Sequence, residues 1–135
     1  DSLLAVDLLR RWDVEGRRPV APMLAVAELG NVLLKHVLDG VTSTHDALAM
    51  LSELPRFVSI TETGLADTKR TLVIAQTFRR RAVYDMHFLI LAENLGCELW
   101  TADERFWRAV SGQFPFVKWL GNARAGSEQR IRLPG

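Results

Sequence analysis

Three carboxylates, Glu28, Asp85 and Asp103, lie at predicted positions where a negative charge needs a partner or a function. Glu28 falls inside a predicted helix with Leu24 four residues before it and Val32 four residues after it, so an apolar helix face carries a charge. An unpaired charge in such a place is costly. A glutamate there is therefore protonated, paired with a cation or bound to a metal, unless it lies at the margin of the face and extends to solvent.

Asp85 and Asp103 are both predicted near the start of a helix. Asp85 falls in the first helical turn, and Asp103 follows a predicted strand. Each could simply cap its helix, because free amides and the helix dipole favour a carboxylate there. The carboxyl ends of strands are also where α/β proteins gather catalytic groups. Glu104, next to Asp103, is either a further acidic ligand or a solvated residue of the first turn.

Together, the three carboxylates indicate a site for a hard metal ion. The two helices and the strand end can bring them to one edge of a sheet, and carboxylate oxygens suit Mg²⁺ or Mn²⁺. Such ions activate water and position phosphate oxygens, so the expected reaction is hydrolysis of a phosphodiester. The three histidines have no ligand spacing, which argues against a zinc site built on them: His36, His45 and His87.

Helices and short strands alternate along the chain, which predicts an α/β sandwich around a mostly parallel sheet. Five of the expected helices cover residues 2–12, 23–38, 63–78, 83–95 and 104–110. One more, the third along the chain, is capped within residues 42–44 and stopped by Pro55. The expected strands are 20–21, 57–60, 97–101 and 116–120. We expect Gly96 to end the fifth helix as a C-cap.

Composition indicates one soluble globular domain. Of the 135 residues, 48% are hydrophobic and 24% are charged, which argues against a disordered chain. No apolar run is long enough for a membrane span. The single cysteine, Cys97, excludes an intramolecular disulfide framework and is predicted to be a small buried apolar residue. We expect one domain over residues 1–121 and a flexible, arginine-containing tail over 122–135.

Three segments resemble motifs of the PIN-domain family. The first is Ala21-Pro22, followed by Glu28 and Gly30-Asn31-Val32-Leu33. The second is Val83-Tyr84-Asp85, followed by residues 89–96. The third is Leu99-Trp100-Thr101-Ala102-Asp103. Their order and spacing agree with the family over roughly residues 1–120, and the size and helix pattern look most like VapC-type toxins. The resemblance implies a three-layer sandwich with a mostly parallel central sheet. It departs from the family in lacking the usual first strand and its Asp, and about 20 residues are expected to be missing on this interpretation.

The resemblance also implies an activity and partners. It implies a Mg²⁺- or Mn²⁺-dependent endoribonuclease of a toxin–antitoxin pair, cytoplasmic and not bound to a membrane, usually a homodimer and inhibited by a small antitoxin. Glu28, Asp85 and Asp103 would be three of the family's four acidic positions, with Asn31 supporting the site and Glu104 as an additional candidate. The alternatives are a PIN-like binding or assembly module without activity, and a plain scaffold whose acidic residues are all caps.

A basic run, Arg79, Arg80 and Arg81, precedes the Asp85 helix. It is predicted either to contact RNA phosphates beside the metal or to be a solvated loop. Three of the tryptophans are expected to make core or dimer contacts: Trp12, Trp100 and Trp119.

Overall fold

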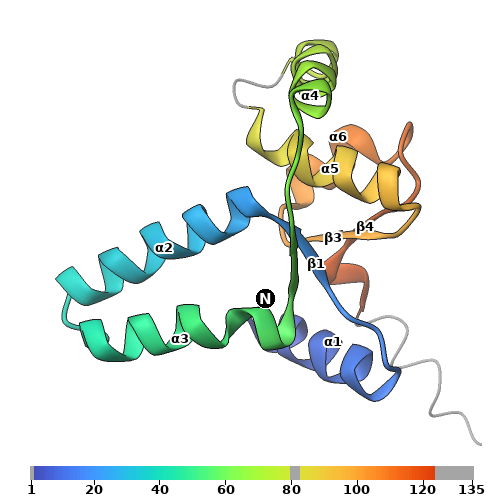
Figure 1. Cartoon of the computed structure of the whole chain (residues 1–135). Coiled ribbons are helices and arrows are strands. Elements are labelled where there is room, and N and C mark those ends of the chain that lie inside the picture. Colours follow the sequence, from blue (N-terminus) through green and yellow to red (C-terminus); the bar gives the residue numbers. More distant parts are fainter. Residues whose placement is uncertain (1, 80–82, 124–135) are drawn as a thin grey trace, which may run out of the picture.

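Helices and three-residue strands alternate in the computed structural model, which describes residues 2–79 and 83–123 (Figure 1). The elements are α1 (Ser2–Val14), β1 (Val20–Pro22), α2 (Met23–Leu38), α3 (Thr44–Phe57), β2 (Ser59–Thr61), α4 (Leu65–Thr77), α5 (Tyr84–Leu95), β3 (Leu99–Thr101), α6 (Glu104–Val110), β4 (Val117–Trp119) and a 3₁₀ turn (Leu120–Asn122). The predicted mixed α/β class is confirmed. Within the described ranges, every helix is too short or too polar to cross a lipid bilayer.

The strands form two separate parallel pairs. β1 pairs with β2, placing Val20 opposite Ser59, and β3 pairs with β4, placing Leu99 opposite Val117. The parallel direction agrees with the prediction, but the described strands do not join into one central sheet. Among the described strands, neither member of one pair is hydrogen-bonded to a member of the other.

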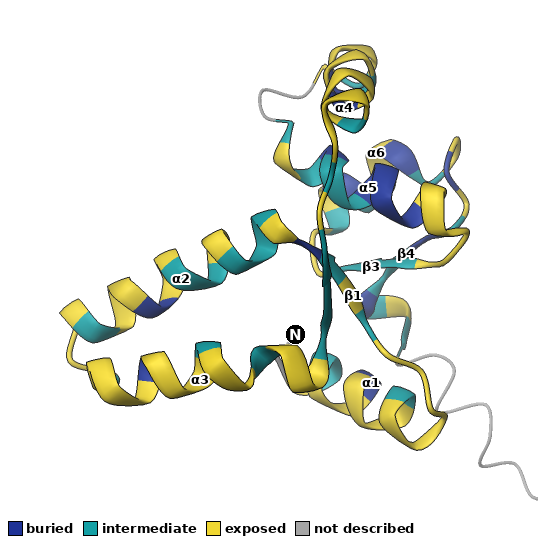
Figure 2. Cartoon of the chain, viewed as in Figure 1, coloured by how far each residue is buried: buried dark blue, intermediate teal, exposed yellow. Residues whose placement is uncertain are grey.

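The hydrophobic core lies between α4, α5, α6 and the β3–β4 pair. Helix α5 is its centre: Met86, Leu89 and Ile90 have no solvent-exposed surface, and Figure 2 shows the helix as largely buried. Burying each such side chain contributes about 1.5–3 kcal/mol. The core cluster consists of Ala75, Met86, Leu89, Phe106, Val110, Phe114 and Val117.

Helices α2 and α3 form a hairpin that extends away from this core (Figure 1). Leu33 and Ala47 are their buried residues, and most other positions are exposed (Figure 2). Ser43 caps α3 by accepting a hydrogen bond from the backbone N–H of Asp46 at 3.0 Å, within the predicted capping segment. The hairpin is therefore held together by little apolar burial of its own.

Two predicted boundaries around α3 are wrong. The helix continues through Pro55 to Phe57, because the next turn still closes when the N–H of Val58 donates to the carbonyl of Leu54 at 3.1 Å. A proline in the last turn costs one backbone hydrogen bond and leaves the rest of the helix intact. Phe57, expected in a buried strand, ends the helix and is 68% exposed.

Cys97 is exposed, so the prediction of a buried residue is also wrong. Gly96 ends α5 in the left-handed conformation, with φ 63°, as predicted. The N–H of Cys97 then donates to the carbonyl of Ala92 at 3.0 Å, which completes the helix cap. Cys97 therefore belongs to the end of α5, and the strand begins later, at Leu99.

Candidate functional site

A pocket of about 220 Å³ lies at the carboxyl end of β3. Its lining residues are Asp85, Phe88, Leu99, Trp100, Thr101, Ala102, Asp103 and Phe106. Asp85 comes from the first turn of α5, and Asp103 from the junction of β3 and α6. The structure therefore brings together two of the three predicted carboxylates, in what we call the Asp85–Asp103 pocket.

Asp103 is fixed by two backbone hydrogen bonds at the start of α6. Its Oδ1 atom accepts from the N–H of Phe106 at 2.9 Å, and its own N–H donates to Oγ1 of Thr101 at 3.0 Å. Asp103 is thus the N-cap of α6, which is one of the two roles that the sequence predicted for it. The side chain of Asp103 can cap α6 and also line the pocket, because its carboxylate has two oxygens.

Asp85 is half-buried and is held by the helix that forms the centre of the core. Met86, the next residue, is fully buried, so the first turn of α5 is anchored and the position of Asp85 is fixed with it. Val83 precedes the helix and offers no side-chain cap. The charge of Asp85 near this helix start is favoured by the helix dipole.

Glu28 and Asn31 lie elsewhere. Both are exposed on α2, and neither lines the Asp85–Asp103 pocket. Val32, expected to make the surface around Glu28 apolar, is itself exposed, so Glu28 extends to solvent. Across residues 2–79 and 83–123, no group of three or more His, Cys, Asp or Glu side chains is placed to hold a metal ion.

Glu104 and the basic run also have defined positions. Glu104 accepts hydrogen bonds from Nε and Nη2 of Arg108 at 2.8 and 2.6 Å, so it behaves as a first-turn residue paired along the surface of α6. Arg79 follows α4, is exposed and has a positive φ of 52°. Arg80 and Arg81 lie outside the described residues, as does the predicted tail from residue 124 onward.

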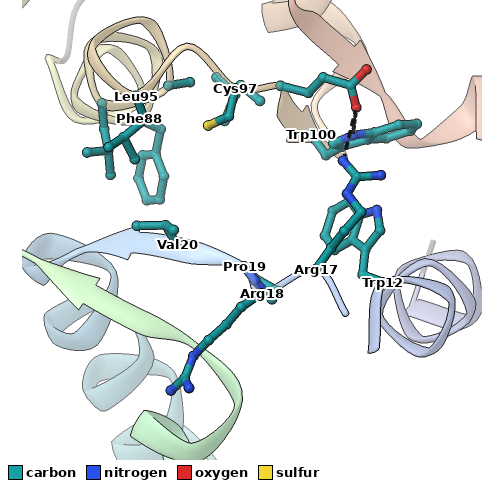
Figure 3. Close-up of a pocket in the computed structure, with 13 residues that line it drawn as sticks. Trp12, Arg17, Arg18, Pro19, Val20, Phe88, Leu95, Cys97 and Trp100 are labelled. Atoms are coloured by element: carbon teal, nitrogen blue, oxygen red, sulfur yellow. Dashed lines mark hydrogen bonds and ion pairs between the residues drawn. The ribbon is translucent and has the colours of Figure 1, made fainter. Parts of the chain in front are cut away.

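A second, larger cavity of about 380 Å³ lies between β1 and β3 (Figure 3). Its lining residues are Trp12, Arg17, Arg18, Pro19, Val20, Phe88, Leu91, Ala92, Leu95, Cys97, Glu98, Leu99 and Trp100. They come from α1, the connection to β1, α5 and β3, so no local pattern of residues marks it and it was not predicted. We call this cavity the β1–β3 groove.

Aromatic and charged side chains that line the groove contact one another. Trp12 meets Trp100 edge-on with ring centroids 6.2 Å apart, and the guanidinium of Arg17 lies 5.5 Å from the Trp12 ring centroid. Glu98 accepts a hydrogen bond from Nε1 of Trp100 at 2.9 Å and lies 3.7 Å from Arg17 (Figure 3). These contacts connect α1 to β3 across the groove.

Comparisons of this chain with protein-family models, with curated proteins and with solved structures gave no match.

Proposed function

We propose that this protein is a Mg²⁺- or Mn²⁺-dependent endoribonuclease of the VapC type, with the three-layer PIN-domain architecture. One observation carries the proposal. Asp85 and Asp103, which belong to different sequence motifs, line the same pocket at the carboxyl end of a parallel strand. Ligands and catalytic groups collect at this end of the strands in α/β proteins.

The donor set of the pocket fits the proposed ion. Mg²⁺ prefers oxygen ligands and is usually held by one or two carboxylates, with water and substrate phosphate completing its shell. Asp85 and Asp103 supply two carboxylates from rigid helix starts. When bound, such an ion supplies an activated water and offsets negative charge on the phosphate. Glu28 is exposed on α2 outside this pocket, so the proposal rests on Asp85 and Asp103.

The residues of this chain would orient the ion and position the RNA. Asp103 keeps its orientation through the backbone of Phe106, and Asp85 through the buried first turn of α5. Phe88 and Trp100 give the pocket an apolar wall. The basic run Arg79, Arg80 and Arg81, which precedes α5 in the sequence, is proposed to neutralise RNA phosphates.

The proposed partners are a second copy of the chain and a small antitoxin, in the cytoplasm. Support comes from apolar side chains that the described part of the chain leaves exposed on α2, α3 and α4: Leu34, Leu38, Leu48, Met50, Leu72 and Val73. We propose that a partner covers these side chains, because contiguous exposed apolar patches mark protein–protein contacts in soluble proteins.

The proposal is tested by Asp85→Asn assayed for cleavage of a labelled RNA in Mn²⁺. We expect the rate to fall at least about 100-fold, because a ligand of the ion is lost. Glu53→Gln, an exposed change on α3, is the matched control and should cleave like the wild type. A wild-type rate for Asp85→Asn would show the assignment to be wrong.

A thermal melt distinguishes the proposal from its rivals. Mn²⁺ should raise the melting temperature of the wild type and leave that of Asp85→Asn unchanged. A scaffold whose acidic residues are only caps predicts no shift in either. A binding module without activity predicts retention of RNA on a filter, with no cleavage at any Mn²⁺ concentration.

A further inference from the structure

The described residues that line the Asp85–Asp103 pocket include two carboxylates and no lysine or arginine. A bound Mg²⁺ or Mn²⁺ ion would offset part of this negative charge, but RNA brings a further negative charge with each nucleotide. Lysine and arginine side chains that contact phosphates supply a large share of the affinity of a nucleic-acid site. A cation is therefore expected outside the pocket, on an element that reaches its rim.

Most arginines of the described chain already have partners. The contacts are Arg10 with Asp7, Arg17 with Glu98, Arg18 with the carbonyl of Pro55, Arg56 with Glu53, Arg70 with Glu93, and Arg108 with Glu104. Arg11 lies on α1 and Arg79 follows α4, and neither helix lines the pocket. Among the described arginines without a partner, Arg105 alone belongs to an element whose start lines the pocket.

The sequence of α6 explains why Arg105 stays unpaired. Its neighbours three and four residues further along the helix are Arg108 and Ala109, and neither is acidic. The adjacent acid, Glu104, is already held by Arg108 through hydrogen bonds of 2.8 and 2.6 Å. The guanidinium of Arg105 is thus available to a ligand.

The place of Arg105 in α6 puts this guanidinium near the pocket. Arg105 is exposed in the first turn of the helix, two residues after Asp103. Helical side chains lean toward the N-terminal end of their helix. In α6 that end is Asp103, which lines the pocket. A long side chain at position 105 can therefore reach a group bound at the pocket's rim.

We propose that Arg105 binds a backbone phosphate of the RNA beside the Asp85–Asp103 pocket. This inference rests on the proposed ribonuclease and adds the residue that holds its substrate. The planar guanidinium matches two phosphate oxygens at once. The contact depends on this side chain because the N–H of Phe106, at the same helix start, is already taken by Asp103.

The test measures retention of a labelled single-stranded RNA on a filter in Mn²⁺. Arg105→Ala should raise the Kd about tenfold, because a charge-assisted contact is lost. The slope of log Kd against log KCl concentration should fall by about 0.7, the value for one phosphate of a single strand. Arg105→Lys keeps the charge without the planar fork, so its Kd should lie between those of the wild type and the alanine variant.

Arg11→Ala is the matched control, since it removes the same charge from an exposed position on α1. It should bind RNA like the wild type. Two RNAs of different sequence should be weakened by the same factor in Arg105→Ala, because a phosphate contact carries no base information. An equal loss in Arg11→Ala, or a loss confined to one RNA sequence, would overturn the proposal.

Cleavage and melting separate this inference from the proposed function. In Arg105→Ala the KM for RNA should rise about tenfold with kcat nearly unchanged, and Mn²⁺ should still raise the melting temperature as in the wild type. A wild type that cleaves RNA, together with an unchanged Kd and KM in Arg105→Ala, would overturn the inference alone. Weakened retention in Arg105→Ala, together with no cleavage by the wild type, would reject the ribonuclease and keep the phosphate contact. A wild type that retains no RNA would overturn both.

Discussion

The carboxylate of Asp103 accepts a hydrogen bond from the backbone N–H of Phe106 at 2.9 Å while lining the same pocket as Asp85. One side chain thus holds the start of α6 and faces the proposed metal position. Loss of activity in an Asp103 variant would therefore be ambiguous unless the effect on folding is measured separately.

Asp103→Ala and Asp103→Asn should separate the two roles. Alanine removes the cap and should lower the free energy of unfolding by about 1 kcal/mol, whereas asparagine is as good a cap and should change it by less than about 0.5 kcal/mol. Both should lose Mn²⁺-dependent cleavage, because both remove the charge. Urea unfolding and RNA cleavage on the same samples provide the measurement. Equal destabilisation by the two variants would mean that the cap is not what holds this residue.

Leu89 should be among the positions most sensitive to truncation. It is fully buried in the core cluster, so Leu89→Ala should cost about 2–5 kcal/mol of unfolding free energy. Leu72→Ala on α4 is the control, since this leucine is 64% exposed and its truncation should cost less than about 0.5 kcal/mol. Comparable losses in urea unfolding would indicate that α4 packs differently from the structure.

Two glycines should respond to alanine with opposite signs. Gly96→Ala forces a Cβ into the left-handed conformation and should lower the unfolding free energy by about 1 kcal/mol. Gly30 lies inside α2, and a Cβ added there would meet nothing within 4 Å, so Gly30→Ala should raise the unfolding free energy by up to about 1 kcal/mol. Urea unfolding of both variants checks the two signs. A loss at Gly30 would show that α2 is more closely packed than its exposure indicates.

Gly121 should not tolerate a side chain. A Cβ at this position would lie 2.3 Å from the ring of Trp119, which stacks on Trp107 with centroids 5.7 Å apart. Gly121→Ala should therefore displace the ring and cost about 1–3 kcal/mol. Tryptophan fluorescence in the folded protein should change as well. An unaltered spectrum with unaltered stability would contradict this packing.

Local signals in the sequence predicted the helices well. The bounds of α2 and α6 agree with the predicted ranges, and Gly96 caps α5. Periodicity and caps act over a few residues, so one sequence is enough to read them. Whether strands join into one sheet depends on contacts between distant segments. The described strands form two separate parallel pairs, so the three-layer sandwich with one central sheet stays a prediction.

The candidate site was predicted only in part, again because the sequence marks local features and not contacts between distant segments. Asp85 and Asp103 stand at helix starts, which the local sequence marks, and they meet in one pocket. The setting of Glu28 depends on what its helix packs against, and α2 leaves that side in solvent. Nothing in the spacing of Trp12 and Trp100 showed that they would meet across a groove.

The α2–α3 hairpin makes this chain poorly suited to a single unfolding probe. All four tryptophans, Trp12, Trp100, Trp107 and Trp119, lie outside the hairpin, whereas its two helices contribute a large share of the helical backbone. Fluorescence therefore follows the part of the chain outside the hairpin, and far-ultraviolet circular dichroism follows both parts. A circular dichroism transition that begins at a lower temperature than the fluorescence transition would identify the hairpin as a separate cooperative unit that melts before the rest.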